Sequence, residues 1–215
     1  MAPGDKITAA KALGRLKRRY PDPKHYLEFD GPFQLLVATI LSAQCTDERV
    51  NMTTPALFGK YPDAGAFAAA PLEDIEEAVR PTGFFRNKAK SIKGASEVIL
   101  KEYNGTVPGD MDGLTRLPGI ARKSANVILQ HGFAKTEGVV VDTHVIRVAG
   151  RLGWTSEKNP VKIERDLMAL FAGSEWKWLP FYLKNHGRAV CKAPKPRCGE
   201  CEVSALCPSA EKKES

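Results

Sequence analysis

Four of the five cysteines lie between residues 191 and 207, in the pattern C-x6-C-x2-C-x5-C. They are Cys191, Cys198, Cys201 and Cys207. Short loops would bring four thiolates together, and thiolates repel one another unless a metal binds them. A metal site is therefore expected rather than disulfide bonds. Zinc ribbons usually contain two CxxC pairs, but only Cys198 and Cys201 form such a pair, so the uneven spacing favours a [4Fe–4S] cluster over zinc.

The loop between the first two of these cysteines is basic. It contains Lys192, Lys195 and Arg197, and Pro194 and Pro196 stiffen it. A positively charged loop held in place by a metal site could contact phosphate groups. The alternative is a charged surface segment without a ligand. The fifth cysteine, Cys45, is distant in sequence, and we interpret it as a packed residue or part of a pocket wall.

The segment LPGIARKSANVIL, at residues 117–129, predicts a helix–hairpin–helix. One helix ends, a Pro-Gly turn follows, and a second helix begins. The free N–H groups of a helix N-terminus bind phosphate, and glycine allows a phosphate to approach the backbone closely. The hairpin would therefore hold DNA without reading its bases. The expected DNA contacts are Pro118, Gly119, Ile120, Ala121 and Arg122.

Lys123 lies in the first turn of the second helix. Helical spacing places Lys123, Asn126 and Gln130 on one face, which we expect to point outward into solvent or a cleft. The opposite face would pack in the core through Ala121, Ala125 and Ile128. Burial in a cleft and the helix N-terminus would both oppose the positive charge of the lysine, and an uncharged amine is a nucleophile. A lysine that only binds phosphate is the alternative.

Asp142 stands in VVVDTHVIR, between an apolar run and a helix. Aspartate is a preferred N-cap residue, so a purely structural role is one interpretation. The functional interpretation requires Asp142 to face Lys123, where it would support a cation developing at a sugar carbon and assist proton transfers. We interpret the neighbouring His144 as structural.

These residues must be positioned by helices, and the predicted fold class is all-α. Apolar periodicity, proline positions and capping residues indicate one helix after another, while residues 139–141 are expected to form a buried extended linker. The predicted helices cover residues 7–20, 32–42, 47–58, 71–80, 86–103, 112–117, 124–131, 145–152, 161–171 and 178–187.

The formal net charge is +7, and it is distributed unevenly. Residues 1–112 contain 15 basic and 15 acidic residues, whereas residues 113–215 contain 17 basic and 10 acidic ones. A one-sided basic field favours a nucleic acid partner, although charge can also serve solubility alone. The longest apolar stretch, at residues 35–41, is far shorter than the roughly 20 residues of a membrane span, and no signal peptide is evident near the N-terminus. A cytoplasmic protein with reduced or metal-bound thiols is expected.

Taken together, these motifs resemble the endonuclease III family of DNA glycosylases. The resemblance covers about residues 6–208 and rests on SAQCTD, LPGIARKSANV, VDTH, HGR and the four-cysteine loop. It implies two helical domains with a DNA-binding cleft between them. One is a six-helix barrel at residues 25–135, with the hairpin at about 112–131. The other combines residues 1–24 and 136–215 and carries a [4Fe–4S] cluster in loop 191–207.

The resemblance also implies a function in base-excision repair. The enzyme would be a DNA glycosylase with AP lyase activity. It would act as a monomer on double-stranded DNA that contains oxidised pyrimidines or abasic sites. In a bacterium it would be associated with the nucleoid. Lys123 would attack C1′ of the damaged nucleotide, expel the base and form a Schiff base, and β-elimination would then nick the strand. Asp142 would activate Lys123 or stabilise the cation that develops at the sugar carbon. Gln44 matches the residue that fills the gap left by the flipped base.

Three residues depart from the family pattern. Ala121 replaces the second hairpin glycine, and its methyl group could hold the phosphate off or demand a different backbone. Phe84 replaces a leucine wedge and could either stack between bases or pack in the core. Cys45 replaces a small residue and could alter the pocket.

Three alternative functions follow from other interpretations of the same motifs. One is a monofunctional adenine-mismatch glycosylase, which the presence of Lys123 disfavours. Another is a non-catalytic DNA-binding clamp, which would gain nothing from a carboxylate at position 142. A third is a zinc-ribbon protein that binds RNA.

Overall fold

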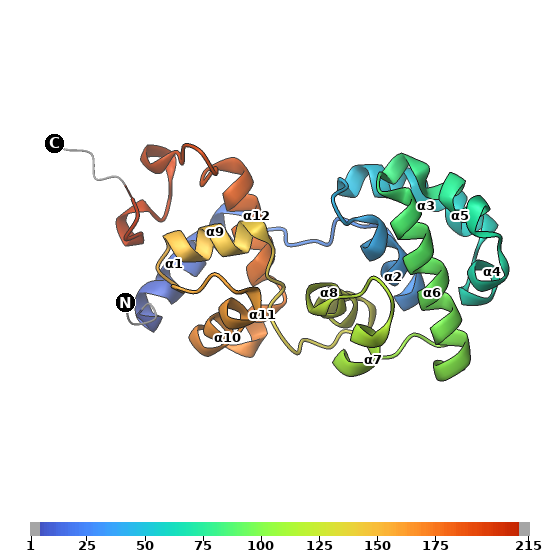
Figure 1. Cartoon of the computed structure of the whole chain (residues 1–215). Coiled ribbons are helices and arrows are strands. Elements are labelled where there is room, and N and C mark those ends of the chain that lie inside the picture. The colour runs from blue at the N-terminus through green and yellow to red at the C-terminus, as the bar shows by residue number, and fades with distance from the viewer. Residues whose placement is uncertain (1–4, 211–215) are drawn as a thin grey trace. The chain divides into compact units, whose positions relative to one another are not determined.

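A computed structural model describes residues 5–210, and no β-strand occurs within that range. The chain divides into two compact units. One consists of His25–Glu137, and the other of the described residues up to Lys24 together with those from Gly138 onward. Each unit is helical and has its own hydrophobic core. The all-α fold class is therefore confirmed (Figure 1).

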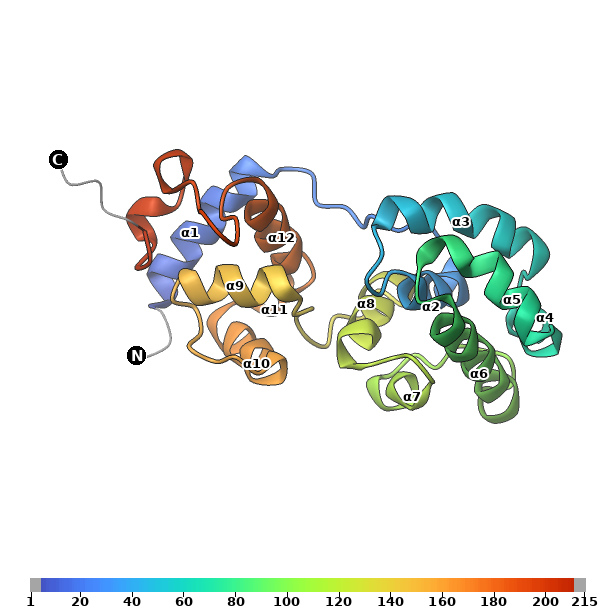
Figure 2. The same ribbon diagram turned by 45° about the horizontal axis from the view of Figure 1, so that its top comes forward.

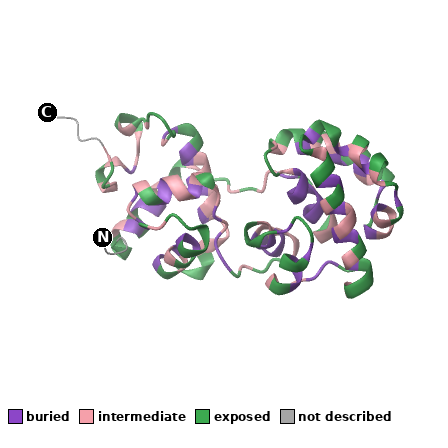
Figure 3. Ribbon diagram, viewed as in Figure 1, coloured by how far each residue is buried: buried purple, intermediate pink, exposed green. Residues whose placement is uncertain are grey.

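The unit formed by His25–Glu137 is built around a buried helix. This helix, α2, has seven consecutive buried residues at its C-terminal end, Leu35 to Leu41, and it packs against α3, α6 and α8. Figure 3 shows the buried residues of each element. The helices of this unit are α2 (Gly31–Leu41), α3 (Asp47–Lys60), α4 (Ala64–Ala69), α5 (Leu72–Val79), α6 (Phe85–Tyr103), α7 (Met111–Arg116) and α8 (Arg122–Gly132), with the 3-10 helix η1 (Arg80–Thr82) before α6.

The other unit packs helix α12 against α1 and α9 (Figures 1 and 2). The contact between α12 and α9 is close, because a Cβ atom added to Gly187 would lie 2.9 Å from Nη2 of Arg147 and 3.0 Å from Nδ1 of His144. The elements of this unit are α1 (Lys6–Arg19), α9 (Thr143–Arg151), α10 (Pro160–Leu170), α11 (Gly173–Trp176) and α12 (Leu179–Ala189), followed by the 3-10 helices η2 (Cys198–Glu200) and η3 (Ser204–Leu206).

Two short helices, α4 and α11, were not expected from the sequence. Helix α4 has the sequence AGAFAA, which is too short to show helical periodicity. Its one clear signal is Asp63, whose side chain caps it by accepting the N–H of Ala66 at 2.9 Å. Residues 139–141 belong to neither a helix nor a strand, and Val139 and Val141 are buried as predicted.

Within the described part of the chain, no helix combines the length and the apolar character required to cross a bilayer.

Candidate functional site

Helices α7 and α8 are joined by a tight turn that forms the predicted hairpin. The N–H of Ile120 donates to the carbonyl of Leu117 at 3.1 Å, and Gly119 has a φ of +81°. The side chains of Leu117 and Ile120 are buried, whereas Pro118 and Gly119 are exposed. The core therefore anchors the turn on both sides. Because the Ile120 side chain is buried and its N–H donates within the turn, Ile120 is better placed to anchor the turn than to contact DNA.

Helix α6 supports the turn from inside the unit. A Cβ atom on Gly119 would lie 2.7 Å from Cβ of Ser91, and one on Gly94 would lie 3.3 Å from Cγ of Pro118. Gly119 is thus required for two reasons, its left-handed backbone and its contact with α6.

Replacement of Gly119 by alanine is expected to destabilise the chain by roughly 1–3 kcal/mol, because the new methyl group is strained by the positive φ and collides with Ser91. Urea unfolding would measure the loss. The control is Gly59→Ala in α3, where nothing lies within 4 Å of the added Cβ. That change should stabilise slightly, since alanine favours helix. Equal stability of the two variants would contradict this account of the turn.

Ala121 is the N-cap residue of α8, with φ −90° and ψ 168°. Any residue adopts this extended conformation, so alanine is accommodated here without strain, and the effect of its methyl group on DNA stays a prediction. Ala121 is exposed, so the expectation that it packs in the core is wrong. Its side chain makes no capping hydrogen bond. The first-turn N–H groups of an eleven-residue helix are therefore not occupied by an N-cap side chain, which is the arrangement that binds an anion.

Lys123 lies in the first turn of α8 and is exposed. Its outward position agrees with the prediction, and its role as a nucleophile stays a prediction. Asn126 and Gln130 are each only 1% exposed, so the prediction that they share an outward face with Lys123 is wrong. Helix α8 packs against both α2 and α7, and Asn126 and Gln130 are buried in this packing.

Gln44 and Phe84 share an unusual backbone conformation. Both are non-glycine residues with positive φ, 51° and 48°, and both are exposed. Such a conformation costs about 1–3 kcal/mol, and residues that adopt it cluster at functional sites. Phe84 is 62% exposed, which excludes the core-packing interpretation. The residue that packs against the core is its neighbour, Phe85.

Lys88, which the sequence did not single out, is buried next to the two loops that lead to Gln44 and Phe84. It is 4% exposed, and its Nζ donates to the carbonyls of Leu41 at 2.8 Å and Thr82 at 2.7 Å. Burial lowers the pKa of Lys88, and the Cys45 thiol opposes that effect. Cys45 is partly buried against the core, which confirms its interpretation as a packed residue.

Asp142 is the N-cap of α9. Its Oδ1 accepts the N–H of Val145 at 2.8 Å, and the residue is half-buried. The N-cap interpretation is therefore confirmed, while the catalytic interpretation stays a prediction. His144 accepts a hydrogen bond from Nη2 of Arg147 at 3.1 Å, and burial lowers its pKa, which agrees with a structural role.

The four clustered cysteines line one cavity, together with Arg151 and His186. None of the five cysteines forms a disulfide bond. A single zinc ion needs its sulfur ligands within about 2.3 Å of one point. Among residues 5–210, no three His, Cys, Asp or Glu side chains converge in that way. The choice between a polynuclear cluster and one zinc ion stays a prediction.

The basic loop is held by an arginine that the sequence did not single out. Nη1 of Arg151 donates to the carbonyl of Lys192 at 2.7 Å and lies 3.4 Å from Sγ of Cys191, and Nη2 donates to the carbonyl of Ala193 at 2.8 Å. Lys192 and Lys195 are exposed. Arg197 is also exposed, but it forms an ion pair with Glu200 at 3.5 Å. The two lysines are therefore the better placed phosphate contacts.

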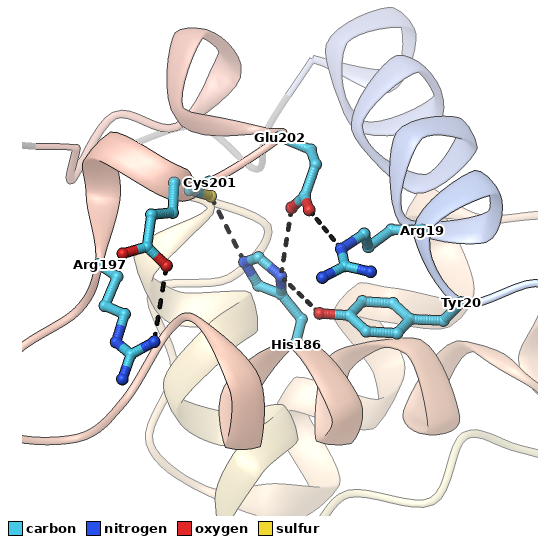
Figure 4. Close-up of polar contacts among 7 residues, drawn as sticks. Arg19, Tyr20, His186, Arg197, Cys201 and Glu202 are labelled. Atoms are coloured by element: carbon cyan, nitrogen blue, oxygen red, sulfur yellow. Dashed lines mark hydrogen bonds and ion pairs between the residues drawn. The ribbon is translucent and has the colours of Figure 1, made fainter.

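A buried histidine connects the cysteine site to α1 (Figure 4). His186 is 1% exposed, its Nδ1 lies 3.4 Å from the hydroxyl of Tyr20, and its Nε2 lies 3.5 Å from Sγ of Cys201. Glu202, which lies 4.0 Å from Nδ1, accepts from Nε of Arg19 at 2.7 Å. Burial lowers the pKa of His186, so the neutral ring carries one N–H. When the Tyr20 hydroxyl donates to Nδ1, the ring proton is on Nε2, and this N–H donates to Sγ of Cys201.

Comparisons with known proteins agree with the hairpin and the cysteine loop. The model of the HhH-GPD superfamily of base excision DNA repair proteins matches residues 37–172. The chain is 54% identical over 206 residues to endonuclease III of Synechocystis sp., covering 96% of this chain and 94% of the relative. It is 35% identical to endonuclease III of Escherichia coli K12, covering 97% and 98%. The chain belongs to the endonuclease III family.

Solved structures of the endonuclease III family share this fold. A trapped endonuclease III–DNA covalent intermediate has a TM-score of 0.91 and 38% sequence identity, with 96% of this chain and 97% of that chain covered. A non-covalent endonuclease III–DNA complex has a TM-score of 0.90 at the same identity, with the same shares of the two chains covered. A thermostable thymine-DNA glycosylase, 21% identical with a TM-score of 0.82, covers 95% of this chain and 97% of its own and shares the fold.

In this member of the endonuclease III family, the residues that the sequence did not reveal hold loops and side chains of the candidate site in place. Lys88 and Arg151 bind backbone carbonyls that are distant in sequence, and His186 approaches a cysteine sulfur. One signal was present for Lys88. It lies on the apolar face of α6, four residues before the buried Ile92, where a lysine needs internal partners.

Proposed function

We propose that this chain is a base-excision DNA glycosylase with AP lyase activity, acting on duplex DNA with oxidised pyrimidines or abasic sites. The observation that carries the proposal is Lys123, an exposed amine in the first turn of α8, directly beyond the hairpin turn. A relative 38% identical to this chain has been trapped as a covalent intermediate with DNA, which supports an attack on DNA by a protein nucleophile.

In the proposed reaction, the uncharged amine of Lys123 attacks C1′ of the damaged nucleotide. The bond from C1′ to the base breaks, the base leaves with the bonding electrons and takes up a proton, and the sugar ring opens to a Schiff base with Nζ. Loss of a proton from C2′ then expels the 3′ phosphate by β-elimination, which nicks the strand. The first step needs the amine in its uncharged form, which is the nucleophile.

The carboxylate of Asp142 has two proposed roles in this reaction. It would support the cation that develops at C1′ and assist the proton transfers. Its capping bond to Val145 fixes the orientation of the carboxylate through Oδ1. Lys123 and Asp142 belong to different units of the chain.

The proposed DNA contacts fall into two classes. The hairpin residues Pro118, Gly119, Ala121 and Arg122 would bind phosphate on the turn that Ile120 anchors, as would Lys192, Lys195 and Arg197 of the basic loop. Gln44 and Phe84 would act on the bases, Gln44 by filling the gap left by the flipped nucleotide and Phe84 by stacking between bases.

We also propose a [4Fe–4S] cluster on Cys191, Cys198, Cys201 and Cys207. When bound, it cross-links loop 191–207, and its role is structural. Arg151 and the cysteines then hold the two exposed lysines of the loop in place. The purified chain should be brown and contain iron and sulfide in equal amounts. A colourless chain that contains one zinc ion would overturn the cluster assignment.

A duplex containing one thymine glycol, incubated with the chain and then treated with borohydride, tests the function. We expect base release, a strand nick and a protein–DNA adduct. Base release without nick or adduct would refute the lyase step and indicate a monofunctional glycosylase. Tight binding without any base release would refute both activities and indicate a non-catalytic DNA-binding protein.

A further inference from the structure

Lys88 connects two separate loops of the His25–Glu137 unit. Its ammonium binds the carbonyl of Leu41, the last residue of α2, and the carbonyl of Thr82, the last residue of η1. The first carbonyl stands at the negative end of a helix, where a cation is stabilised. A buried ammonium that reaches two carbonyls from different segments fixes the distance between those segments.

Each of these loops continues into an exposed left-handed residue. Gln44 follows Leu41 by three residues, and Phe84 follows Thr82 by two. The two strained residues therefore stand just beyond the two carbonyls that one ammonium binds. Strain of this kind persists only when the surrounding structure imposes it, and Lys88 supplies a direct restraint on both loops.

We propose that Lys88 is a positioning residue for base extrusion, which holds Gln44 and Phe84 at the spacing needed to open the duplex and replace the displaced base. This inference rests on the proposed function, in which these two side chains act on the bases. Lys88 is buried and acts only through the loops, so it is not itself a catalytic residue.

The same helix provides a matched control. Lys93, five residues further along α6, donates through Nζ to the carbonyls of Ala68 and Ala70, at the end of α4. Like Lys88, it donates to two backbone carbonyls, but both belong to one segment, and it also pairs with Glu97 at 3.7 Å. Lys93→Met should therefore reproduce the loss of an ammonium bound to two carbonyls without affecting the loops of Gln44 and Phe84.

The test compares single-turnover base release from a thymine-glycol duplex with cleavage of a duplex that already contains an abasic site. Lys88→Met should lower base release by about 10- to 100-fold, because small misplacements of positioning groups have effects of this size. Abasic-site cleavage should fall by no more than about 3-fold, since no base has to be extruded there. Lys93→Met should change both rates by no more than about 3-fold.

Fluorescence of 2-aminopurine placed opposite the lesion supplies a readout that needs no catalysis. Binding of the wild-type chain should raise it as the bases separate, and Lys88→Met, but not Lys93→Met, should reduce that rise. Lys88→Arg keeps the charge and the donors in a bulkier side chain, and it should show the same selectivity with a smaller loss. It serves as the second variant if Lys88→Met does not fold.

Two outcomes distinguish the inference from the proposed function. If the wild-type chain releases no base, the proposed function fails, and the fluorescence comparison still decides the role of Lys88. If Lys88→Met and Lys93→Met lose base release, abasic-site cleavage and fluorescence equally, Lys88 only supports the fold and the inference is overturned.

Discussion

Replacement of Lys123 by alanine is expected to lower base release and strand cleavage by about 1,000-fold or more, because the variant lacks the amine that forms the covalent intermediate. The adduct trapped by borohydride should disappear. Stability should change little, since the side chain is exposed and the residue is not in the core. Single-turnover rates, adduct yield and urea unfolding would measure the three effects.

The matched control for this prediction is Arg122→Ala. Arg122 is the adjacent residue, it is also exposed in the first turn of α8, and its replacement removes the same charge from the hairpin. It should weaken DNA binding by about 3- to 10-fold and leave the adduct in place. If Lys123→Ala also only weakened binding and still gave the adduct, Lys123 would be a phosphate-binding residue and the Schiff-base mechanism would be wrong.

The sequence predicted what is encoded locally. The hairpin turn follows from a proline, a glycine and the helices around them, and the Asp142 cap follows from an aspartate before an apolar periodic segment. The cysteine loop is similarly local, because its four residues lie close together in the chain. Each of these features depends on neighbours within a few residues, so spacing alone was sufficient.

The sequence could not predict features that depend on tertiary packing. Asn126 and Gln130 are polar and were placed outward, but two helices cover α8 and bury both of them. Arg151 binds carbonyls about forty residues away, and nothing in its own helix indicates that partner. The absence of backbone strain at Ala121 also required the dihedral angles, because the sequence alone does not give them.

The second large effect is expected at Asp142, where two substitutions separate capping from chemistry. Asparagine caps helices as well as aspartate does, so Asp142→Asn should keep the bond to Val145 and change the free energy of unfolding by no more than about 0.5 kcal/mol. It lacks the negative charge, however, and base release should fall by about 100- to 1,000-fold. Asp142→Ala should lose the same activity and also about 1 kcal/mol of stability.

Asp63 provides the control for these variants, because it caps α4 through the same type of bond, to the N–H of Ala66 at 2.9 Å. Asp63→Asn should leave both stability and base release almost unchanged. The decisive comparison is between asparagine and alanine at position 142. If Asp142→Asn is fully active and only Asp142→Ala is impaired, the carboxylate acts solely as a helix cap. Loss of activity in both variants, with stability lost only in the alanine variant, assigns the negative charge to the reaction.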